Sequence, residues 1–297
     1  MSQTFIVLIP TQELTDRNYL LVRQSMKIFI TDSISSNLKD LFWNVFFKSK
    51  NRGISLERHF PWIDNSLNDV IFFEAKVSSV TVGGLVLRRT KLNISEKECQ
   101  IGMIGLVCVS ATNRGVGIAT ELLTKTIDFS KGKNYDYLTL WTNQHRIYSK
   151  LNFCISDPWH YGWIQTEKCV EYSKCNEIHV SKSVTEIKSS PLPPFATGIY
   201  KHSIGDISFI LIKDGDGDII VSHEGNIEYL ALFMIHSLPQ RWRLNAVKND
   251  PLISALKKQG ASVKLSPVNL QMWLNFNDEN NLHSILEKIT IPVLYRI

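Results

Sequence analysis

The stretch TNRGVGIATELL, residues 112–123, connects an apolar run at 101–109 to a pattern typical of an α-helix. Two glycines, Gly115 and Gly117, stand on either side of a single valine at this junction. A turn between a strand and a helix needs one glycine at most, so the second glycine indicates that a bulky group comes close to the backbone. Because the start of a helix exposes unpaired N–H groups and partial positive charge, the sequence predicts a phosphate site here.

Two common phosphate-binding loops do not fit this stretch. A P-loop continues from its glycines into Lys followed by Ser or Thr, and that pair is missing here. A Rossmann loop needs a third glycine where Thr120 stands, and an acidic residue about 20 positions later at the end of a strand. Neither requirement is met, so the sequence argues against a nucleotide-binding protein of either kind.

A third pattern does fit. Arg114, Gly117 and Ala119 match the spacing R/Q-x-x-G-x-G/A, which resembles the pyrophosphate loop of the GNAT acetyltransferase superfamily. Downstream, YSKLNF at 148–153 resembles the second signature of that family, Y-x-K-L-G-F, with Asn152 in place of glycine. Asparagine is tolerated at this position because it also adopts left-handed backbone conformations. The two motifs occur in the expected order and on the expected elements.

The resemblance implies how the chain would use acetyl-CoA. The pantetheine arm would pair with the backbone of 107–109, beside the strand at 137–142, and the pyrophosphate would bind the N–H groups of 115–120. Tyr148 would protonate the leaving thiolate, since a phenol with a pKa of about 10 is protonated at neutral pH. No metal is expected. The candidate cofactor-binding residues are Val107, Cys108, Val109, Arg114, Gly115, Val116, Gly117, Ile118, Ala119, Thr120 and Asn143.

The general base is less well defined. Members of the family often place a glutamate on the long strand before the pyrophosphate loop, but residues 99–109 contain no acid. Glu74, on the neighbouring predicted strand, is the tentative base, and a chain of water molecules is the alternative. The other candidates are His145 and Asp157 or His160, whereas Glu98 stands at the start of the long strand, too far from the site.

The order of predicted elements indicates an α/β (α+β) fold with a mixed sheet and helices on both faces. The resemblance implies two GNAT-like domains, each a mixed, largely antiparallel twisted sheet flanked by helices. A GNAT acetyltransferase domain is predicted at 1–185, a proline-rich linker at 186–195 and a degenerate GNAT-like domain at 196–297. The order strand–helix–strand–helix–strand occurs in both, as a duplication would produce. Strands are predicted at 5–10, 69–77, 79–89, 99–109, 135–142, 241–248 and 261–276, and helices at 16–30, 36–49, 116–130, 146–151, 226–238 and 250–260.

The second half lacks the residues that the family uses. No R-x-x-G-x-G/A spacing occurs at 221–230, where Glu224 and Glu228 would repel phosphates. Leu256 occupies the position of Tyr148, and leucine cannot donate a proton. We therefore expect this half to bind no acetyl-CoA, and to close the acceptor cleft, complete the sheet of the first domain or mediate dimerisation. The acidic run at 214–218 is predicted to be a hairpin turn rather than a calcium loop.

Composition sets wider limits. Hydrophobic residues make up 44% and charged residues 21% of the chain, which is typical of a globular protein. The net charge of +5 suits a small polyanionic ligand and is too weak to indicate nucleic-acid binding. No apolar run reaches the length of a membrane span. The five scattered cysteines suggest reduced thiols and a cytoplasmic protein, which we expect to be a monomer or homodimer.

The resemblance implies an enzyme that moves an acetyl group from acetyl-CoA directly to an amine of an unidentified acceptor. Aromatic stretches at 59–64 and 157–165 are candidates for the lining of the acceptor site. The alternative is a catalytically silent scaffold that binds acyl-CoA or a protein partner, which the missing strand glutamate favours.

Overall fold

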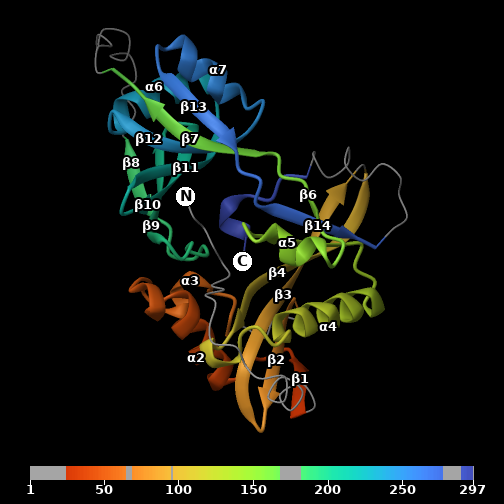
Figure 1. The fold of residues 1–297 in the computed structure, drawn as a ribbon. Coiled ribbons are helices and arrows are strands. Elements are labelled where there is room, and N and C mark those ends of the chain that lie inside the picture. The colour runs from red at the N-terminus through yellow and green to blue at the C-terminus, as the bar shows by residue number, and fades with distance from the viewer. Residues whose placement is uncertain (1–24, 65–68, 95, 168–181, 277–288, 297) are drawn as a thin grey trace. The chain divides into compact units, whose positions relative to one another are not determined.

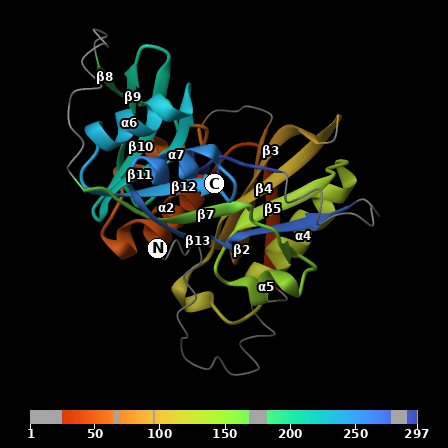
Figure 2. The ribbon, with the colours of Figure 1, turned by 90° about the horizontal axis from the view of Figure 1, so that it is seen from above.

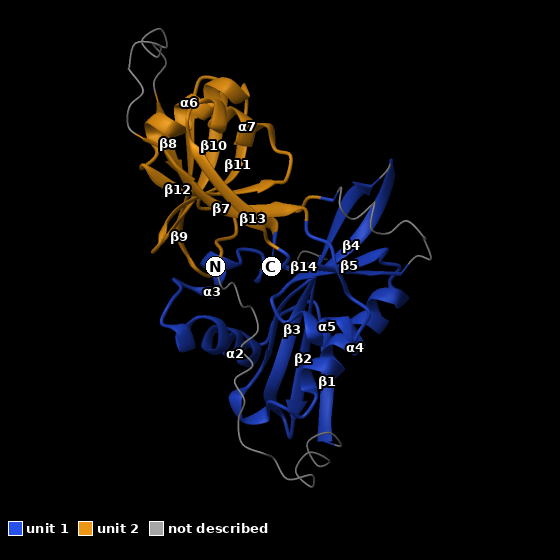
Figure 3. Ribbon diagram, turned by 45° about the horizontal axis from the view of Figure 1, so that its top comes forward, with its two compact units in different colours: residues 1–157, 269–289, 296–297 blue, residues 158–268, 290–295 orange. Residues whose placement is uncertain are grey.

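The computed structural model forms two compact units (Figure 1, Figure 3). Unit 1 consists of residues 1–157, 269–289 and 296–297, and unit 2 of residues 158–268 and 290–295, so both contain segments that are distant in sequence. No helix in the described ranges is long and apolar enough to cross a membrane. The structure describes residues 25–64, 69–94, 96–167, 182–276 and 289–296.

The sheet of unit 1 has the strand order β1-β2-β3-β4-β5-β14-β6. β4 and β5 run parallel, and the other neighbours run antiparallel. Figure 2 shows β3, β4 and β5 side by side. The strands are β1 (Met26–Thr31), β2 (Val70–Val77), β3 (Val80–Ile94), β4 (Lys97–Val109), β5 (Tyr137–Trp141), β6 (Cys154–Ile155) and β14 (Gln271–Asn275).

Two helices cover opposite faces of this sheet, and two adjacent glycines of β3 make room for them. A Cβ atom on Gly84 would meet Leu38 of α2, whereas one on Gly83 would meet Ile118 and Leu122 of α4. Neighbouring residues of a strand point to opposite faces, so the two helices lie on opposite sides. The helices of unit 1 are α2 (Ser36–Phe46), α3 (Leu56–His59), α4 (Ile118–Gly132) and α5 (His145–Ser149), with short 3₁₀ turns η1 (Lys48–Lys50) and η2 (Ala111–Asn113).

The sheet of unit 2 has the order β13-β7-β12-β11-β10-β9-β8. β11 and β12 run parallel, and the other neighbours run antiparallel. The elements are β7 (Trp159–Gln165), β8 (Ser183–Glu186), β9 (Ala196–Ile204), β10 (Ile207–Asp214), β11 (Gly217–Glu224), β12 (Arg241–Val247), β13 (Ser262–Pro267), α6 (Ile227–Ser237), α7 (Pro251–Lys258) and η4 (Val293–Tyr295).

The predicted fold class is confirmed, because both units are mixed, mainly antiparallel sheets with flanking helices. The predicted repetition of element order is also found. The series β4-α4-β5-α5-β6 in the first half corresponds to β11-α6-β12-α7-β13 in the second. In each series the first two strands form the parallel pair of the sheet.

Each sheet takes one strand from the other half of the sequence. β14 pairs with β5 and β6 in unit 1, so the expectation that the second half completes the first sheet is confirmed. β7 lies between β12 and β13 in unit 2. The proline-rich stretch at 186–195 lies within unit 2, and the compact units do not divide there. The extents of two homologous domains, 1–185 and 196–297, stay a prediction.

Two predicted elements were wrong. Residues 26–30, predicted within a helix at 16–30, belong to β1, whose side chains alternate between partly buried and exposed along MKIFIT. The single strand predicted at 261–276 is two strands, β13 and β14, in different sheets. Pro267 has no N–H to extend a ladder, and Asn269 has a left-handed backbone with φ of 51°. The predicted strand at 5–10 and residues 16–24 lie outside the described residues.

The hairpin predicted at the acidic run is confirmed. β10 and β11 pair antiparallel up to Asp214 and Gly217, so the acidic run forms the turn. Within the described part of the chain, no group of three or more metal-ligating side chains is found at this turn or elsewhere.

Candidate functional site

The loop before α4 is anchored by apolar side chains and exposes its glycines. Val116 and Ile118 are buried in the core cluster that packs α4 on the sheet. Gly115 precedes Val116 and Gly117 lies between the two branched residues, and both glycines are exposed, with φ angles of 85° and 82°. Residues with side chains rarely adopt this left-handed backbone, so glycine is favoured at both positions. The alternation of glycine and branched residues therefore fixes the loop and keeps its outer surface bare.

The backbone N–H groups of this loop are available to a ligand. Gly117 is the N-cap of α4 and has no side chain that could cap the helix. Within the described residues, no side chain and no carbonyl outside the helix accepts a hydrogen bond from the N–H groups of 115–120. The Nε of Arg114 donates to the carbonyl of Val109 at 3.2 Å, which ties the loop to the end of β4. This arrangement is suited to an anion.

The parallel strands β4 and β5 separate next to this loop. Their pairing runs only from Ile101–Tyr137 to Met103–Thr139, although β4 continues to Val109. At Leu106 the φ angle is 52°, and the pairing of β3 with β4 shifts register at the same level. Beyond Met103, the side of β4 that faces β5 therefore has no paired strand among the described residues. An extended ligand could pair there.

Tyr148 is buried in α5. It is 1% exposed, and its ring packs edge-on against Phe153 at 6.0 Å between centroids. Its hydroxyl has no hydrogen-bond partner among the described residues. A structural hydrogen bond to a backbone carbonyl is therefore not found for this hydroxyl. Burial raises the pKa of this phenol, which is therefore protonated at neutral pH.

The chain turn after α5 fixes the position of Tyr148. Asn152 has a φ angle of 65°, which confirms the predicted left-handed backbone. The N–H of Phe153 donates to the carbonyl of Tyr148 at 3.2 Å, and the N–H of Asn152 donates to the carbonyl of Ser149 at 3.1 Å. This is the Schellman pattern of a helix C-terminus.

Two other predicted cofactor contacts have clear environments. Asn143 is exposed after β5, and its Oδ1 accepts a hydrogen bond from Gln144 Nε2 at 3.3 Å. Cys108 is buried on β4, and burial raises the pKa of its thiol. A thiol in this state is a poor nucleophile.

The carboxylate of Glu74 is fully engaged by its neighbours. Its Oε1 accepts hydrogen bonds from Ser35 Oγ at 2.9 Å and Thr81 Oγ1 at 2.5 Å. Its Oε2 lies 3.2 Å from Lys76 Nζ. Ser35 is also the N-cap of α2, so this buried carboxylate joins α2 to the β2–β3 hairpin. These contacts favour a structural role.

The other candidate bases are also held by structural contacts or lie elsewhere. Glu98 pairs with Lys91 at 2.7 Å on the surface, and His145 Nε2 lies 2.8 Å from the carbonyl of Asn269. Asp157 Oδ2 accepts hydrogen bonds from the N–H groups of residues 270 and 271. His160 is on β7 in unit 2. No described contact joins any of them to Tyr148.

Unit 2 differs at both corresponding positions. At the start of α6, Asn226 Oδ1 accepts hydrogen bonds from the N–H groups of Glu228 and Tyr229, so a side chain occupies the place that is open in α4. At the end of α7, Gly260 has a φ angle of 83°, and Ala261 N–H donates to the carbonyl of Leu256. This repeats the turn at Asn152 and gives Leu256 the position of Tyr148.

One contact could not be read from the sequence. Arg296, near the end of the chain, lies over the ring of Trp141 at the end of β5, 5.5 Å from its centroid. Burial lowers the pKa of Arg296 to about 10, although the charge of Asp157 opposes this shift. The two segments are more than a hundred residues apart, and no motif links them. The end of the chain comes close to β5 partly because β14 pairs with β5. The sequence did not indicate this pairing, because residues 261–276 were predicted to be a single strand.

The two aromatic stretches differ in exposure. In the stretch at 59–64, Phe60, Trp62 and Ile63 are buried. In the stretch at 157–165, residues 159–165 form β7, an inner strand of the second sheet, where Trp159 is buried while Tyr161 and Trp163 are partly exposed. That either stretch lines an acceptor site stays a prediction.

Comparisons with known proteins agree with this geometry. Residues 31–156 match the family described as acetyltransferase (GNAT) domain. No curated protein matches the sequence significantly.

The fold is similar to several solved structures. One is a GCN5-related N-acetyltransferase from Kribbella flavida (TM-score 0.58, 10% identity, 84% of this chain and 71% of that chain). Another is a probable N-acyltransferase from Enterococcus faecalis (TM-score 0.59, 13% identity, 84% and 72%). A third is a GCN5-related N-acetyltransferase from Anabaena variabilis (TM-score 0.55, 15% identity, 84% and 73%). At these identities the similarity concerns the fold.

Proposed function

We propose that the chain transfers an acetyl group from acetyl-CoA to an amine, since residues 31–156 match the model of the acetyltransferase (GNAT) domain. The observation that carries this proposal is the loop before α4. It combines two left-handed glycines with a helix start that no side chain caps, at the end of a strand that separates from its parallel neighbour.

The proposed binding mode uses backbone groups. The pyrophosphate of acetyl-CoA would accept hydrogen bonds from the N–H groups of 115–120, where the dipole of α4 favours negative charge. The side chain of Arg114 adds positive charge beside the loop. The pantetheine arm would pair with 107–109 on the open side of β4. Asn143 would lie near the other end of the cofactor site, after β5.

The proposed reaction is a direct transfer within a ternary complex. The amine nitrogen bonds to the carbonyl carbon of the thioester, and the C–S bond breaks. The thiolate takes the hydroxyl proton of Tyr148, and the proton that the amine loses restores the phenol through water. A general acid of this kind typically contributes about 10²–10⁴ in rate. The buried, protonated state of Tyr148 supports this role.

A base must accept the proton that the amine loses. Glu74 is the tentative base, but the hydrogen bonds from Ser35 and Thr81 and the ion pair with Lys76 favour a structural function. We propose that water receives the amine proton unless substrate binding frees this carboxylate.

Unit 2 is proposed to bind no acetyl-CoA. Asn226 caps the helix start that corresponds to α4, and Leu256 replaces the tyrosine. We propose a cytoplasmic location, which the free thiols of Cys99, Cys108 and Cys154 support. We also propose that the protein is a monomer or homodimer.

Release of the CoA thiol tests the proposal against the silent scaffold. The full chain is mixed with acetyl-CoA and, separately, with amino sugars, polyamines, amino acids and a lysine peptide. Thiol release that depends on one of these amines is the expected result. Tight binding of acetyl-CoA with no thiol release for any amine class would favour the scaffold.

A further inference from the structure

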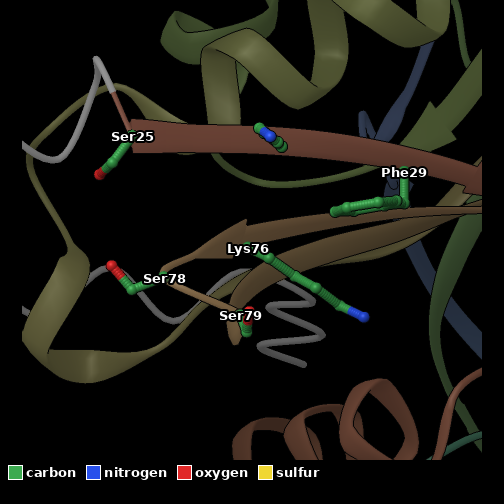
Figure 4. Close-up of a pocket in the computed structure, with 6 residues that line it drawn as sticks. Ser25, Phe29, Lys76, Ser78 and Ser79 are labelled. Atoms are coloured by element: carbon green, nitrogen blue, oxygen red, sulfur yellow. The ribbon is translucent and has the colours of Figure 1, made fainter.

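A cavity of about 420 Å³ lies at the edge of the unit 1 sheet, away from the loop before α4. We call it the β1–β2 pocket (Figure 4). It is open to the surface and lies between the start of β1 and the turn from β2 to β3. In the strand order, β1 is separated from β4 by β2 and β3, so this pocket is distinct from the proposed acetyl-CoA site. Its lining residues are Ser25, Lys27, Phe29, Lys76, Ser78 and Ser79.

Two lysines lie side by side in the lining of this pocket. Lys27 of β1 and Lys76 of β2 are directly opposite in the antiparallel register, so their side chains leave the same face. Like charges placed directly opposite destabilise a strand pair. Glu74 neutralises only one of them, through its Oε2 at 3.2 Å from Lys76 Nζ, while its Oε1 accepts from Ser35 and Thr81. Lys27 has no ion-pair partner among the described residues, so the pocket keeps a net positive charge.

The turn beside the lysines has an unfavourable backbone conformation. Val77 and Val80 are paired, so the connection consists of Ser78 and Ser79 alone. Both serines have positive φ angles, 48° and 69°. A two-residue turn of this type favours Asn-Gly or Gly-Gly, because side chains strain it. Serine at both positions places two hydroxyl donors at the rim of the pocket, and neither has a described partner within the protein.

An apolar surface completes the pocket. Phe29 is 45% exposed on the edge strand, and Lys76 Nζ lies 5.1 Å from the centroid of its ring. In Figure 4, Ser25, Ser78 and Ser79 gather at one end, and Phe29 lies further along β1. The pocket thus combines cationic and hydroxyl donors with an aromatic face.

From this arrangement we propose that the β1–β2 pocket binds a phosphomonoester carried on a flat or apolar group. The ammonium groups and serine hydroxyls donate to the phosphate oxygens, and such charge-assisted bonds are the strong ones. The ring of Phe29 packs against the organic part of the ligand. Binding there also removes the repulsion between the two lysines and covers the exposed phenylalanine.

Calorimetric titration of the full chain with AMP, inorganic phosphate and adenosine tests this inference. AMP presents a phosphomonoester and a flat ring, phosphate presents only the charge, and adenosine presents only the ring. The expected order of affinity is AMP, then phosphate, with adenosine weakest. The same titrations on Gly117→Glu separate this pocket from the loop before α4, and AMP binding should persist in that variant.

Three variants make the test specific. Lys27→Gln should weaken AMP and phosphate binding roughly tenfold or more and should raise the Tm of the free protein, since it removes a like-charge pair. Phe29→Thr should weaken AMP but leave phosphate unchanged. Lys201→Gln removes the same charge from an exposed strand position in unit 2 and should change nothing.

Three results would overturn the inference. These are no AMP binding by the wild-type chain at about 10 mM, AMP binding that is equal in Lys27→Gln, and AMP binding that disappears in Gly117→Glu. The last would place the phosphate on the loop before α4. None of them bears on thiol release from acetyl-CoA, which is measured separately.

Discussion

Two glycines determine what can approach the start of α4. Gly115 and Gly117 have positive φ angles and lie at the surface, while Val116 and Ile118 are buried. The spacing of these glycines was visible in the sequence and was enough to suggest a phosphate site. The sequence did not show that the helix start is uncapped, because that depends on every neighbouring side chain.

Tyr148 provides the first prediction. Tyr148→Phe removes the proton donor and keeps the ring that packs on Phe153, so turnover should fall by about 10²–10⁴ while acetyl-CoA affinity changes little. Tyr135→Phe is the matched control, since Tyr135 is another buried tyrosine of the same core. Steady-state thiol release and calorimetry measure the two quantities. Full turnover in Tyr148→Phe would make Tyr148 structural.

The same residue sets an expectation for pH dependence. The acid form of Tyr148 is active in the proposed mechanism, and burial raises its pKa above the ordinary value. Turnover of the wild-type chain should therefore show no loss from this group up to roughly pH 10. A fall of turnover that begins near pH 8, in a chain that is still folded by circular dichroism, would argue against a phenol as the acid.

Glu74 gives a prediction that separates structure from chemistry. Glu74→Gln loses the ion pair with Lys76 and disturbs the contacts with Ser35 and Thr81, so unfolding free energy should fall by about 1–3 kcal/mol with turnover retained at low temperature. Denaturant unfolding and thiol release are the measurements. A normal stability with turnover reduced at least about 10²-fold would instead identify Glu74 as the base.

Glu98→Gln is the matched control for this substitution. Glu98 pairs with Lys91 on the exposed surface, where such a pair contributes about 0–1 kcal/mol. It should therefore change neither stability nor turnover appreciably.

At the scale of elements, the turn after α5 connects a local backbone preference to the site. Asn152 adopts the left-handed conformation that the family motif gives to glycine. This could be predicted from the sequence, since asparagine is the usual alternative to glycine at a helix C-terminus. The corresponding glycine in α7, Gly260, shows that the second half keeps the turn while it loses the tyrosine.

Substitutions at this turn should show how much its left-handed backbone affects stability. Asn152→Gly should keep or raise the free energy of unfolding. Asn152→Ala should lower it by about 1–2 kcal/mol, because the left-handed backbone is unfavourable for alanine. Gly260→Ala should cost a similar amount, since no atom lies near a Cβ there and only the φ angle is strained. Denaturant unfolding gives the values. Equal stability of Asn152→Gly and Asn152→Ala would contradict this account of the turn.

The predictions for β1, β13 and β14 were wrong because the sequence does not show which sheet a strand joins. β1 is short and lies at a sheet edge, where an alternation of six residues competes poorly with a helical pattern over fifteen. β13 and β14 are adjacent in sequence and lie in different sheets, and only Pro267 and Asn269 mark the break. Strand propensity describes each segment correctly but does not say which sheet it joins.

At the scale of the whole molecule, the two sheets are not built from contiguous halves. All five residues of β5 are buried, and β14 pairs with every one of them. Buried Met272 of β14 also belongs to the core that contains Tyr148. The element order of both halves was predictable, because each element carries its own pattern. The exchange of β7 and β14 was not, because it depends on long-range pairing.

A shortened chain tests this exchange. Residues 1–185 alone lack β14 and leave β5 without its antiparallel partner, so we expect no cooperative thermal unfolding and no binding of acetyl-CoA. The same chain with residues 268–276 joined through a flexible linker should recover part of both. Calorimetry of the two chains gives the answer. Cooperative unfolding and full affinity in residues 1–185 alone would show that the first domain does not need β14.

The most direct test of the central claim is calorimetric titration of the full chain with acetyl-CoA. The wild-type chain should bind, and Gly117→Glu should weaken binding roughly 100-fold or more, because it places a side chain and a negative charge in the phosphate site. Thr124→Glu, which adds the same charge to an exposed position of α4, should bind like the wild type. Equal affinity of Gly117→Glu and the wild type, or no binding by the wild type at about millimolar acetyl-CoA, would contradict the assignment of this loop.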